Sequence, residues 1–152
     1  QAEQAITAGA KVILMVNLDS GSGAQIIELA RAAGVAVIDY DRLTVEGPGA
    51  DYYVSFDNVA VGRLMGEAML EALEGFEGVP NVVLLNGGPT DNNATLFREG
   101  YYGAVEEKFT AGEWNLVDEQ AVPDWQHAYR SYPILDLAQA AHCTLYSRLF
   151  QN

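Results

Sequence analysis

Short apolar runs alternate with longer amphipathic segments along most of the chain. Val12 to Val16 and Asn81 to Leu85 are largely apolar, the pattern of strands that are covered on both faces of a parallel sheet. Between the runs, apolar residues recur with helical spacing, which predicts helices that pack on a sheet. We expect helices at 1–7, 24–33, 59–73 and 93–109, and strands at 12–16, 35–38, 52–56, 81–85 and from 114 onward.

Cap and turn residues lie where these elements are expected to begin and end. Asp19, Ser20 and Ser22 are candidate N-caps for the helix at 24–33, and Gly34 is placed to follow its C-cap. Candidate N-caps also precede the two later helices, at Asp57 or Asn58 and at Asp91 or Asn92. The alternation predicts a Rossmann-like α/β fold, with parallel sheets flanked by helices and joined by right-handed crossovers.

The two ends of the chain fit this pattern less well. There is no initiator Met, so we expect the chain to start inside a longer protein or after processing. After residue 130, Pro133 interrupts a possible helix, and only a weak amphipathic pattern follows at 135–149. The sheet would then lack its next strand and have an open edge.

Composition excludes several classes of partner. The formal net charge is -13, from 21 acidic and 8 basic residues. Binding to nucleic acid or to an anionic membrane surface needs clustered Lys and Arg, so we expect neither as a partner. No apolar stretch approaches the ~20 residues of a transmembrane helix, and Cys143 has no second cysteine with which to form a disulfide.

The sequence offers no catalytic or metal-binding motif. His127 and His142 lack metal-ligand spacing, and no nucleophile elbow, Walker loop or dinucleotide fingerprint occurs. We therefore expect no metal, no cofactor and no enzymatic activity. An enzyme on a doubly wound sheet stays as an alternative, but it would need a nucleophile–base pair or a metal cluster at the strand ends.

Polar residues instead gather where strands are expected to end, which is where open α/β sheets bind ligands. Asp41 and Arg42 follow one strand, and Asp91, Asn92 and Asn93 follow another. A carboxylate, amides and a guanidinium together offer the mixed acceptors and donors that a polyhydroxylated small molecule needs. The alternative for Asp41 and Arg42 is a surface ion pair, worth about 0–1 kcal/mol.

The other candidate residues also have a structural alternative. We interpret Asp91 or Asn92 as a helix cap and Asn93 as a ligand, although Asn often serves as a cap itself. Asp91 could orient Asn93 or Arg98 behind the site, although for Arg98 we favour a solvated or cap-supporting role. Trp125 follows a strand in a loop, where its ring could stack on the C–H face of a sugar or could cover the edge of the core.

These residues resemble a known family, the periplasmic sugar-binding proteins of ABC importers with the type I periplasmic-binding-protein fold, closest to the D-xylose-binding type. The similarity runs from about residue 1 to about residue 129, and its most specific block is 91–100. The motifs that carry it are Tyr40-Asp41-Arg42, the segment 51–58, the segment 89–100, and Asp124-Trp125.

The resemblance implies a role for each matching residue. Asp41 and Arg42 would hydrogen-bond sugar hydroxyls from a first lobe, Asn93 would bind from a second lobe, and Trp125 would form the stacking wall. Residues 55–58 would be the first hinge crossing. The resemblance thus divides the chain into a partial N-terminal lobe at 1–56, a partial C-terminal lobe at 57–130, and a tail at 131–152 that does not match the family.

The resemblance also implies a function. Two lobes would close on a monosaccharide, with D-xylose favoured, and would deliver it to an ABC permease. The protein would act in the periplasm or as a cell-surface lipoprotein, and the ligands of the family that lie beyond both ends of the similarity would be missing here. The alternative function for the same architecture is that of the effector-binding core of a sugar-responsive transcription regulator.

Overall fold

The computed structural model describes residues 1–125, and the tail at 131–152 with its possible helix lies outside these residues. The described elements alternate between helices and strands, as the apolar pattern predicts. In chain order they are α1 (Ala2–Thr7), β1 (Val12–Met15), α2 (Ala24–Ala32), β2 (Ala36–Tyr40), β3 (Tyr52–Val54), α3 (Asn58–Ala72), β4 (Asn81–Asn86), α4 (Asn92–Thr110), β5 (Asn115–Ala121) and a 3₁₀ turn, η1 (Pro123–Trp125).

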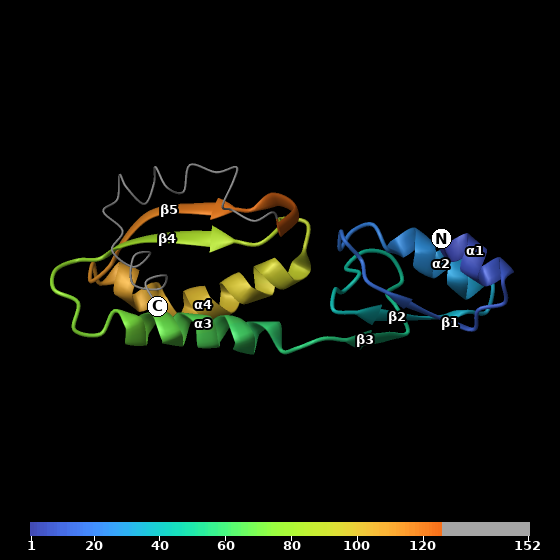
Figure 1. Cartoon of the computed structure of the whole chain (residues 1–152), viewed down its shortest axis with the longest axis horizontal. Helices are drawn as coiled ribbons and strands as arrows, with labels where there is room; N and C mark the ends of the chain where they lie inside the picture. Colours follow the sequence, from blue (N-terminus) through green and yellow to red (C-terminus); the bar gives the residue numbers. More distant parts are fainter. Residues whose placement is uncertain (126–152) are drawn as a thin grey trace, which may run out of the picture.

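The strands form two separate parallel sheets. The first has the order β1-β2-β3 and the second pairs β4 with β5. Figure 1 shows the sheets in two bodies joined by an extended stretch between β3 and α3. We call the body built from α1 to β3 the first lobe, and the body built from α3 to β5 the second lobe. The α/β fold with parallel sheets flanked by helices is confirmed, while the lobe boundary at residues 56 and 57 stays a prediction.

Helices cover one face of the first-lobe sheet. α1 and α2 both lie on the same side of it (Figure 1), above a core of Met15, Ile27, Ala30, Val35 and Val37. The opposite face is apolar but open, and Leu14 is 62% exposed there. The expectation that strand 12–16 is covered on both faces is therefore wrong within the described residues.

In the second lobe, two long helices pack against each other so closely that their backbones touch. A Cβ built on Gly62 of α3 would lie 2.2 Å from the carbonyl oxygen of Phe97, and one built on Gly100 of α4 would lie 2.1 Å from that of Val59. Both distances are far below contact, so only glycine fits at the crossing. This contact brings the N-terminal ends of α3 and α4 side by side.

The caps of the helices are partly those expected. Asp57 caps α3 by accepting from the backbone N–H of Ala60 at 2.9 Å, and Asp91 caps α4 by accepting from that of Asn93 at 3.0 Å. Gly34 has φ 71° just after the C-cap of α2, as predicted. The expected side-chain N-cap of α2 is wrong, because its N-cap is Gly23 and no side chain caps it.

We expect Gly100→Ala to destabilise the protein by about 1–3 kcal/mol, because the added methyl group would force the two helices apart. Gly103→Ala is the matched control on the same helix, since a Cβ there meets nothing within 4 Å. That control should be neutral or stabilising by up to about 1 kcal/mol through helix propensity. Urea denaturation followed by circular dichroism measures both, and equal effects of the two substitutions would contradict the close packing.

Candidate functional site

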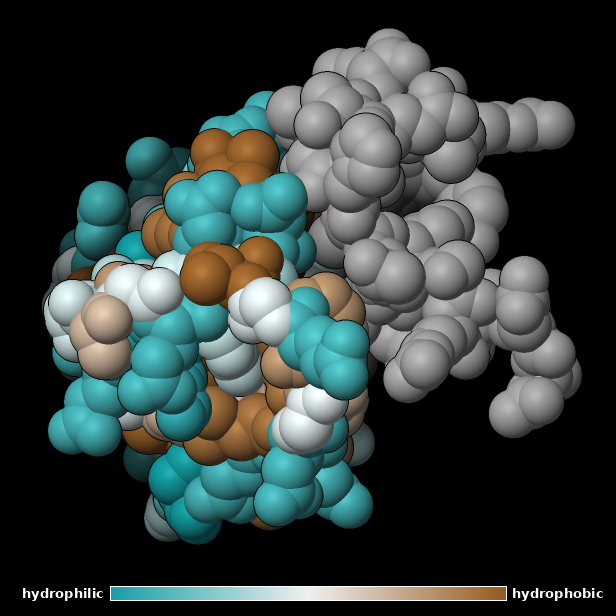
Figure 2. Space-filling model, turned by 90° about the vertical axis from the view of Figure 1, so that its left-hand side faces the viewer, coloured by the Kyte–Doolittle hydropathy of each residue, from teal (hydrophilic) through white to brown (hydrophobic). Residues whose placement is uncertain are grey.

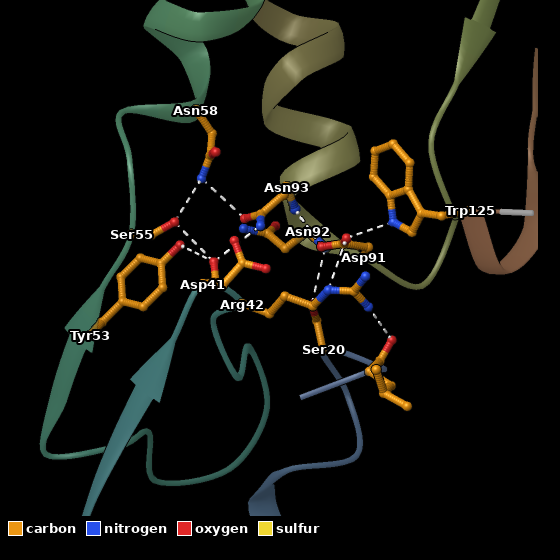
Figure 3. A network of polar contacts seen from close by, with 11 residues as sticks. Ser20, Asp41, Arg42, Tyr53, Ser55, Asn58, Asp91, Asn92, Asn93 and Trp125 are labelled. Atoms are coloured by element: carbon orange, nitrogen blue, oxygen red, sulfur yellow. Dashed lines mark hydrogen bonds and ion pairs between the residues drawn. The ribbon is translucent and has the colours of Figure 1, made fainter. Parts of the chain in front are cut away.

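The predicted polar residues meet at the junction between the lobes (Figure 3). Asp41 and Arg42 follow β2 in the first lobe, and Asp91 to Asn93 begin α4 in the second lobe. Asn58, at the start of α3, lies beside them. The carboxyl ends of strands and the N-terminal ends of helices thus face one another across the junction, as is usual for a ligand site on an α/β sheet.

Asp41 has an unusual backbone that is held by several hydrogen bonds. Its φ is 69°, a left-handed conformation that non-glycine residues adopt rarely, although Asp tolerates it better than most. Its carbonyl oxygen accepts from Ser55 Oγ at 2.9 Å, Asn93 Nδ2 at 3.0 Å and Tyr53 Oη at 3.3 Å. Its N–H donates to the carbonyl of Val54 at 2.8 Å. The surroundings therefore fix the direction of this residue.

The carboxylate of Asp41 makes no hydrogen bond or ion pair with any described residue, and it carries no dashed line in Figure 3. The residue is only half-buried. An ionised carboxylate is purely an acceptor with about four lone-pair sites, so this group is free to accept from a ligand. Among the predicted site residues, Asp41 is the one whose charged group is left available.

Asn93, predicted as a ligand, joins the lobes instead. It is only 4% exposed, its Nδ2 donates to the carbonyl of Asp41, and its Oδ1 accepts from Asn58 Nδ2 at 3.1 Å. Asn58 Nδ2 also lies 3.3 Å from Ser55 Oγ, which closes a ring of four residues around the crossing. One amide hydrogen and one lone pair of Asn93 remain for a ligand, and that role stays a prediction.

Asp91 is the most heavily used side chain at the junction. It is 3% exposed, and besides capping α4 it accepts from Trp125 Nε1 at 2.8 Å and forms an ion pair with Arg42 Nε at 3.2 Å. The same oxygen, Oδ2, takes both of these donors. Arg42 also donates from Nη1 to the carbonyl of Leu18 at 2.6 Å. Asp91 therefore supports both Arg42 and Trp125.

Trp125 lies at the end of the second lobe with its ring partly open to solvent. The residue is 42% exposed, and its ring meets that of Phe97 edge-on at 6.5 Å. A Cβ on Gly87 would lie 2.1 Å from the indole, so the ring rests directly on that glycine backbone. The hydrogen-bonded N–H and the exposure of the residue match what a stacking wall requires.

Sequence reasoning missed two residues of the junction. Ser20 accepts at Oγ from the N–H of Asn92 at 3.0 Å, and its own N–H donates to the carbonyl of Thr90 at 2.9 Å, so it joins the lobes rather than capping α2. The sequence predicts Asn58 as a helix cap or as part of the hinge crossing, yet its side chain also binds Asn93, and its Oδ1 has no partner among the described residues. Neither contact has a signal in the local sequence, since 72 positions separate Ser20 from Asn92.

Arg98 does not join this group. Its Nη2 donates to Glu119 Oε2 at 2.9 Å, its Nε also binds that carboxylate, and its guanidinium lies 4.7 Å from the ring centre of Tyr102. A bulge in β5 explains the pairing, because Val82 pairs with Leu116 but Val83 pairs with Asp118. The extra residue shifts Glu119 to the face that carries α4. The contacts of Arg98 therefore stay within the second lobe and do not reach the junction.

One surface hollow of the second lobe lies far from the junction. Residues from the C-terminal ends of α3 and α4 and from the loops that follow these helices line it, including Leu70, Phe76, Val79 and Trp114. Figure 2 shows this end of the molecule, where hydrophobic and hydrophilic surface alternate. Since the polar cluster lies at the opposite ends of the same helices, this hollow is not part of the candidate site.

Residues 1–131 match the family described as periplasmic binding protein domain. The chain belongs to this family. Among curated relatives, the multiple sugar-binding periplasmic receptor of Rhizobium radiobacter is 33% identical over 115 residues, which make up 74% of this chain and 32% of the relative. The D-xylose-binding periplasmic protein of Escherichia coli K12 is 31% identical over 125 residues, or 82% of this chain and 36% of the relative.

Solved structures of the family agree with this assignment. A carbohydrate transporter solute-binding protein from Chloroflexus aurantiacus, in complex with D-glucose, is 38% identical with a TM-score of 0.67, and the match covers 77% of this chain and 33% of that one. This periplasmic binding protein chain thus spans about a third of the length of its relatives. The resemblance inferred from the sequence is confirmed at the level of the family.

Residues 1–125 contain neither a membrane-spanning helix nor a cluster of metal-ligating side chains. None of their helices combines the length and the apolar character needed to cross a bilayer. No group of three or more His, Cys, Asp or Glu side chains within them is arranged to hold a metal ion.

The Arg98–Glu119 pair predicts a pH-dependent contribution to stability. Hydrogen bonds from Arg98 lower the pKa of the Glu119 carboxyl below its ordinary value of 4.5. Because the pKa of Glu119 is lower in the folded state, the ionised pair stabilises the protein at pH values above the ordinary pKa. This contribution disappears as the pH falls through the lowered pKa. Glu119→Gln should therefore be less stable than the unmodified chain at pH 7, and the difference should shrink toward pH 3.

Urea denaturation at several pH values measures this difference. Glu106→Gln is the control, because Glu106 is an exposed residue of α4 whose carboxylate has no partner among the described residues. Its effect on the free energy of unfolding should be small at every pH. A Glu119→Gln difference that is the same at pH 7 and pH 3 would contradict the pairing.

Proposed function

We propose that this chain is part of a solute-binding protein that captures a monosaccharide between its lobes for import by an ABC transporter. The observation that carries the proposal is the carboxylate of Asp41, which has no partner among the described residues and lies at the same junction as the partly exposed Trp125. A monosaccharide has hydroxyl groups that donate to a carboxylate and a C–H face that packs on an aromatic ring. Few other small molecules combine these two demands.

Each candidate residue has a distinct role in this proposal. Asp41 accepts from sugar hydroxyls, and the N–H groups of Arg42 that bind neither Leu18 nor Asp91 donate to them. Asn93 contributes its remaining amide hydrogen from the second lobe. Trp125 offers the face of its ring, while Asp91 and Asn92 support the site from behind.

The names of the relatives support a sugar as the ligand, although those names include several sugars. They are described as receptors and binding proteins for D-xylose, for D-glucose or for multiple sugars. We favour D-xylose, in keeping with the D-xylose-binding relative. These names describe binding rather than chemical conversion, so we propose a binding protein and not an enzyme.

Hinge closure is the proposed mechanism. The contacts across the junction join the lobes through a small number of polar groups, which a rotation about the crossing between β3 and α3 would make or break. A sugar that binds the closed arrangement more tightly than the open one shifts the population toward it. The closed form would then dock on the permease in the periplasm, or at the cell surface if the parent protein is a lipoprotein.

Calorimetric titration of the chain with D-xylose, D-glucose, D-ribose and L-arabinose tests this function. We expect saturable binding of one or more of these sugars. Asp41→Ala and Trp125→Ala should each weaken binding by about tenfold to a hundredfold, since hydrogen bonds to a charged group contribute about 1.5–3 kcal/mol.

Glu28→Gln is the control for the loss of one negative charge, because Glu28 is an exposed residue of α2 without a described partner. It should bind the sugars like the unmodified chain. If Asp41→Ala also binds with unchanged affinity, Asp41 is not a ligand. If no sugar binds although circular dichroism reports a folded chain, the proposed function fails for this chain.

A further inference from the structure

Three donors from three parts of the chain converge on the carboxylate of Asp91. The backbone N–H of Asn93 reaches Oδ1 at 3.0 Å, while Trp125 Nε1 at 2.8 Å and Arg42 Nε at 3.2 Å share Oδ2. In Figure 3 these contacts meet at one side chain between the lobes. Arg42 comes from the first lobe, whereas Asn93 and Trp125 belong to the second.

Only a carboxylate satisfies this arrangement. An asparagine here would place its oxygen either toward Asn93, with its NH₂ group facing the N–H groups of Arg42 and Trp125, or toward Arg42 and Trp125, with the helix cap lost. The site is also buried, since the side chains of Arg42 and Asp91 are 17% and 4% exposed. A mismatched donor in such a place costs more than at the surface.

Because Arg42 and Trp125 bind the same oxygen of Asp91, the position of the indole depends on whether the first lobe is in contact. When the lobes touch, Oδ2 is fixed by Arg42 from one side and holds the N–H of Trp125 on the other. When the lobes separate, Arg42 leaves and the charge of Asp91 is no longer paired, so water competes for the oxygen that holds the indole. How firmly the Trp125 ring is held thus depends on contact between the lobes.

We propose that Asp91 is a positioning residue that couples contact between the lobes to the placement of the Trp125 ring. The part of this inference that concerns sugar affinity rests on the proposed function, whereas the coupling itself does not. The hydrogen bonds that connect Asp41, Ser55, Asn58 and Asn93 lie beside the crossing between the lobes. A rotation of one lobe about this crossing moves these atoms least. The contact of Asp91 with Arg42, like those of Ser20 with Thr90 and Asn92, therefore reports whether the lobes are together.

The test compares Asp91→Asn with Asp57→Asn in the full chain without ligand. Asp57 is the N-cap of α3, and among the described residues its carboxylate accepts from the N–H of Ala60 alone, so asparagine replaces it as a cap with the same loss of one charge. Iodide quenching reports the Trp125 ring, because the other tryptophan, Trp114, is 7% exposed. Small-angle X-ray scattering reports the separation of the lobes.

We expect Asp91→Asn to raise both the quenching constant and the radius of gyration above those of the unmodified chain, while Asp57→Asn changes neither beyond the small effect of its charge on quenching. If both values for Asp91→Asn equal those of Asp57→Asn, the proposal is overturned. A rise in only one of the two values also overturns it, because the coupling requires that both change together.

A second variant covers the case in which Asp91→Asn does not fold. Arg42→Lys leaves the cap of α4 and the bond from Trp125 intact, but a lysine cannot place donors on both Leu18 and Asp91 with the geometry of a guanidinium. It should raise the radius of gyration and the quenching constant at an unchanged helical signal. Values equal to those of the unmodified chain would overturn the proposal.

Sugar titration then separates this inference from the proposed function. If the unmodified chain binds a sugar, Asp91→Asn should weaken binding about tenfold or more, and Asp57→Asn should not. Unchanged affinity in Asp91→Asn would overturn the role of Asp91 in binding. If the unmodified chain binds no sugar, the proposed function fails, while the ligand-free quenching and scattering still decide whether Asp91 couples the two lobes.

Discussion

The carbonyl oxygen of Asp41 accepts from three side chains, and the relation between the two lobes depends on this convergence. Tyr53 donates from the neighbouring strand, Ser55 from the crossing, and Asn93 from the second lobe. A left-handed backbone at a non-glycine residue costs about 1–3 kcal/mol and persists only where the surroundings over-determine it. The same hydrogen bonds engage the backbone of Asp41 and leave its carboxylate without a partner among the described residues.

The close crossing of α3 and α4 explains how Asn93 reaches that carbonyl. Gly62 lies about one turn after Asn58, and Gly100 about two turns after Asn93, so the helices touch near the ends that enter the junction. Bulkier residues at the crossing would separate Asn58 from Asn93, whose amides are 3.1 Å apart. The packing of the second lobe therefore controls polar contacts that lie at its edge.

Much of this arrangement is predictable from the sequence, because it follows from local patterns. The apolar runs give the strands, Asp91 is recognisable as a cap, and the polar residues after strands point to the junction. The Arg98–Glu119 pair is not predictable, because it depends on a bulge after Leu116 that reverses which face Glu119 occupies. The contacts of Arg42 with Asp91 and of Ser20 with Asn92 depend on how two lobes meet, which no local spacing encodes.

The two aspartates of the junction show how the number of donors decides the role of a carboxylate. Asp91 is buried, and the backbone N–H, the indole and the guanidinium that meet it leave little capacity for a ligand. Asp41 is half-buried, and its backbone groups are hydrogen-bonded, whereas its carboxylate has no partner among the described residues. An ionised group tolerates a position without a protein partner only where water or a ligand can reach it. Under the proposed function, the carboxylate of Asp41 marks the side of the junction that meets the sugar, and the buried carboxylate of Asp91 marks the side that holds the lobes together.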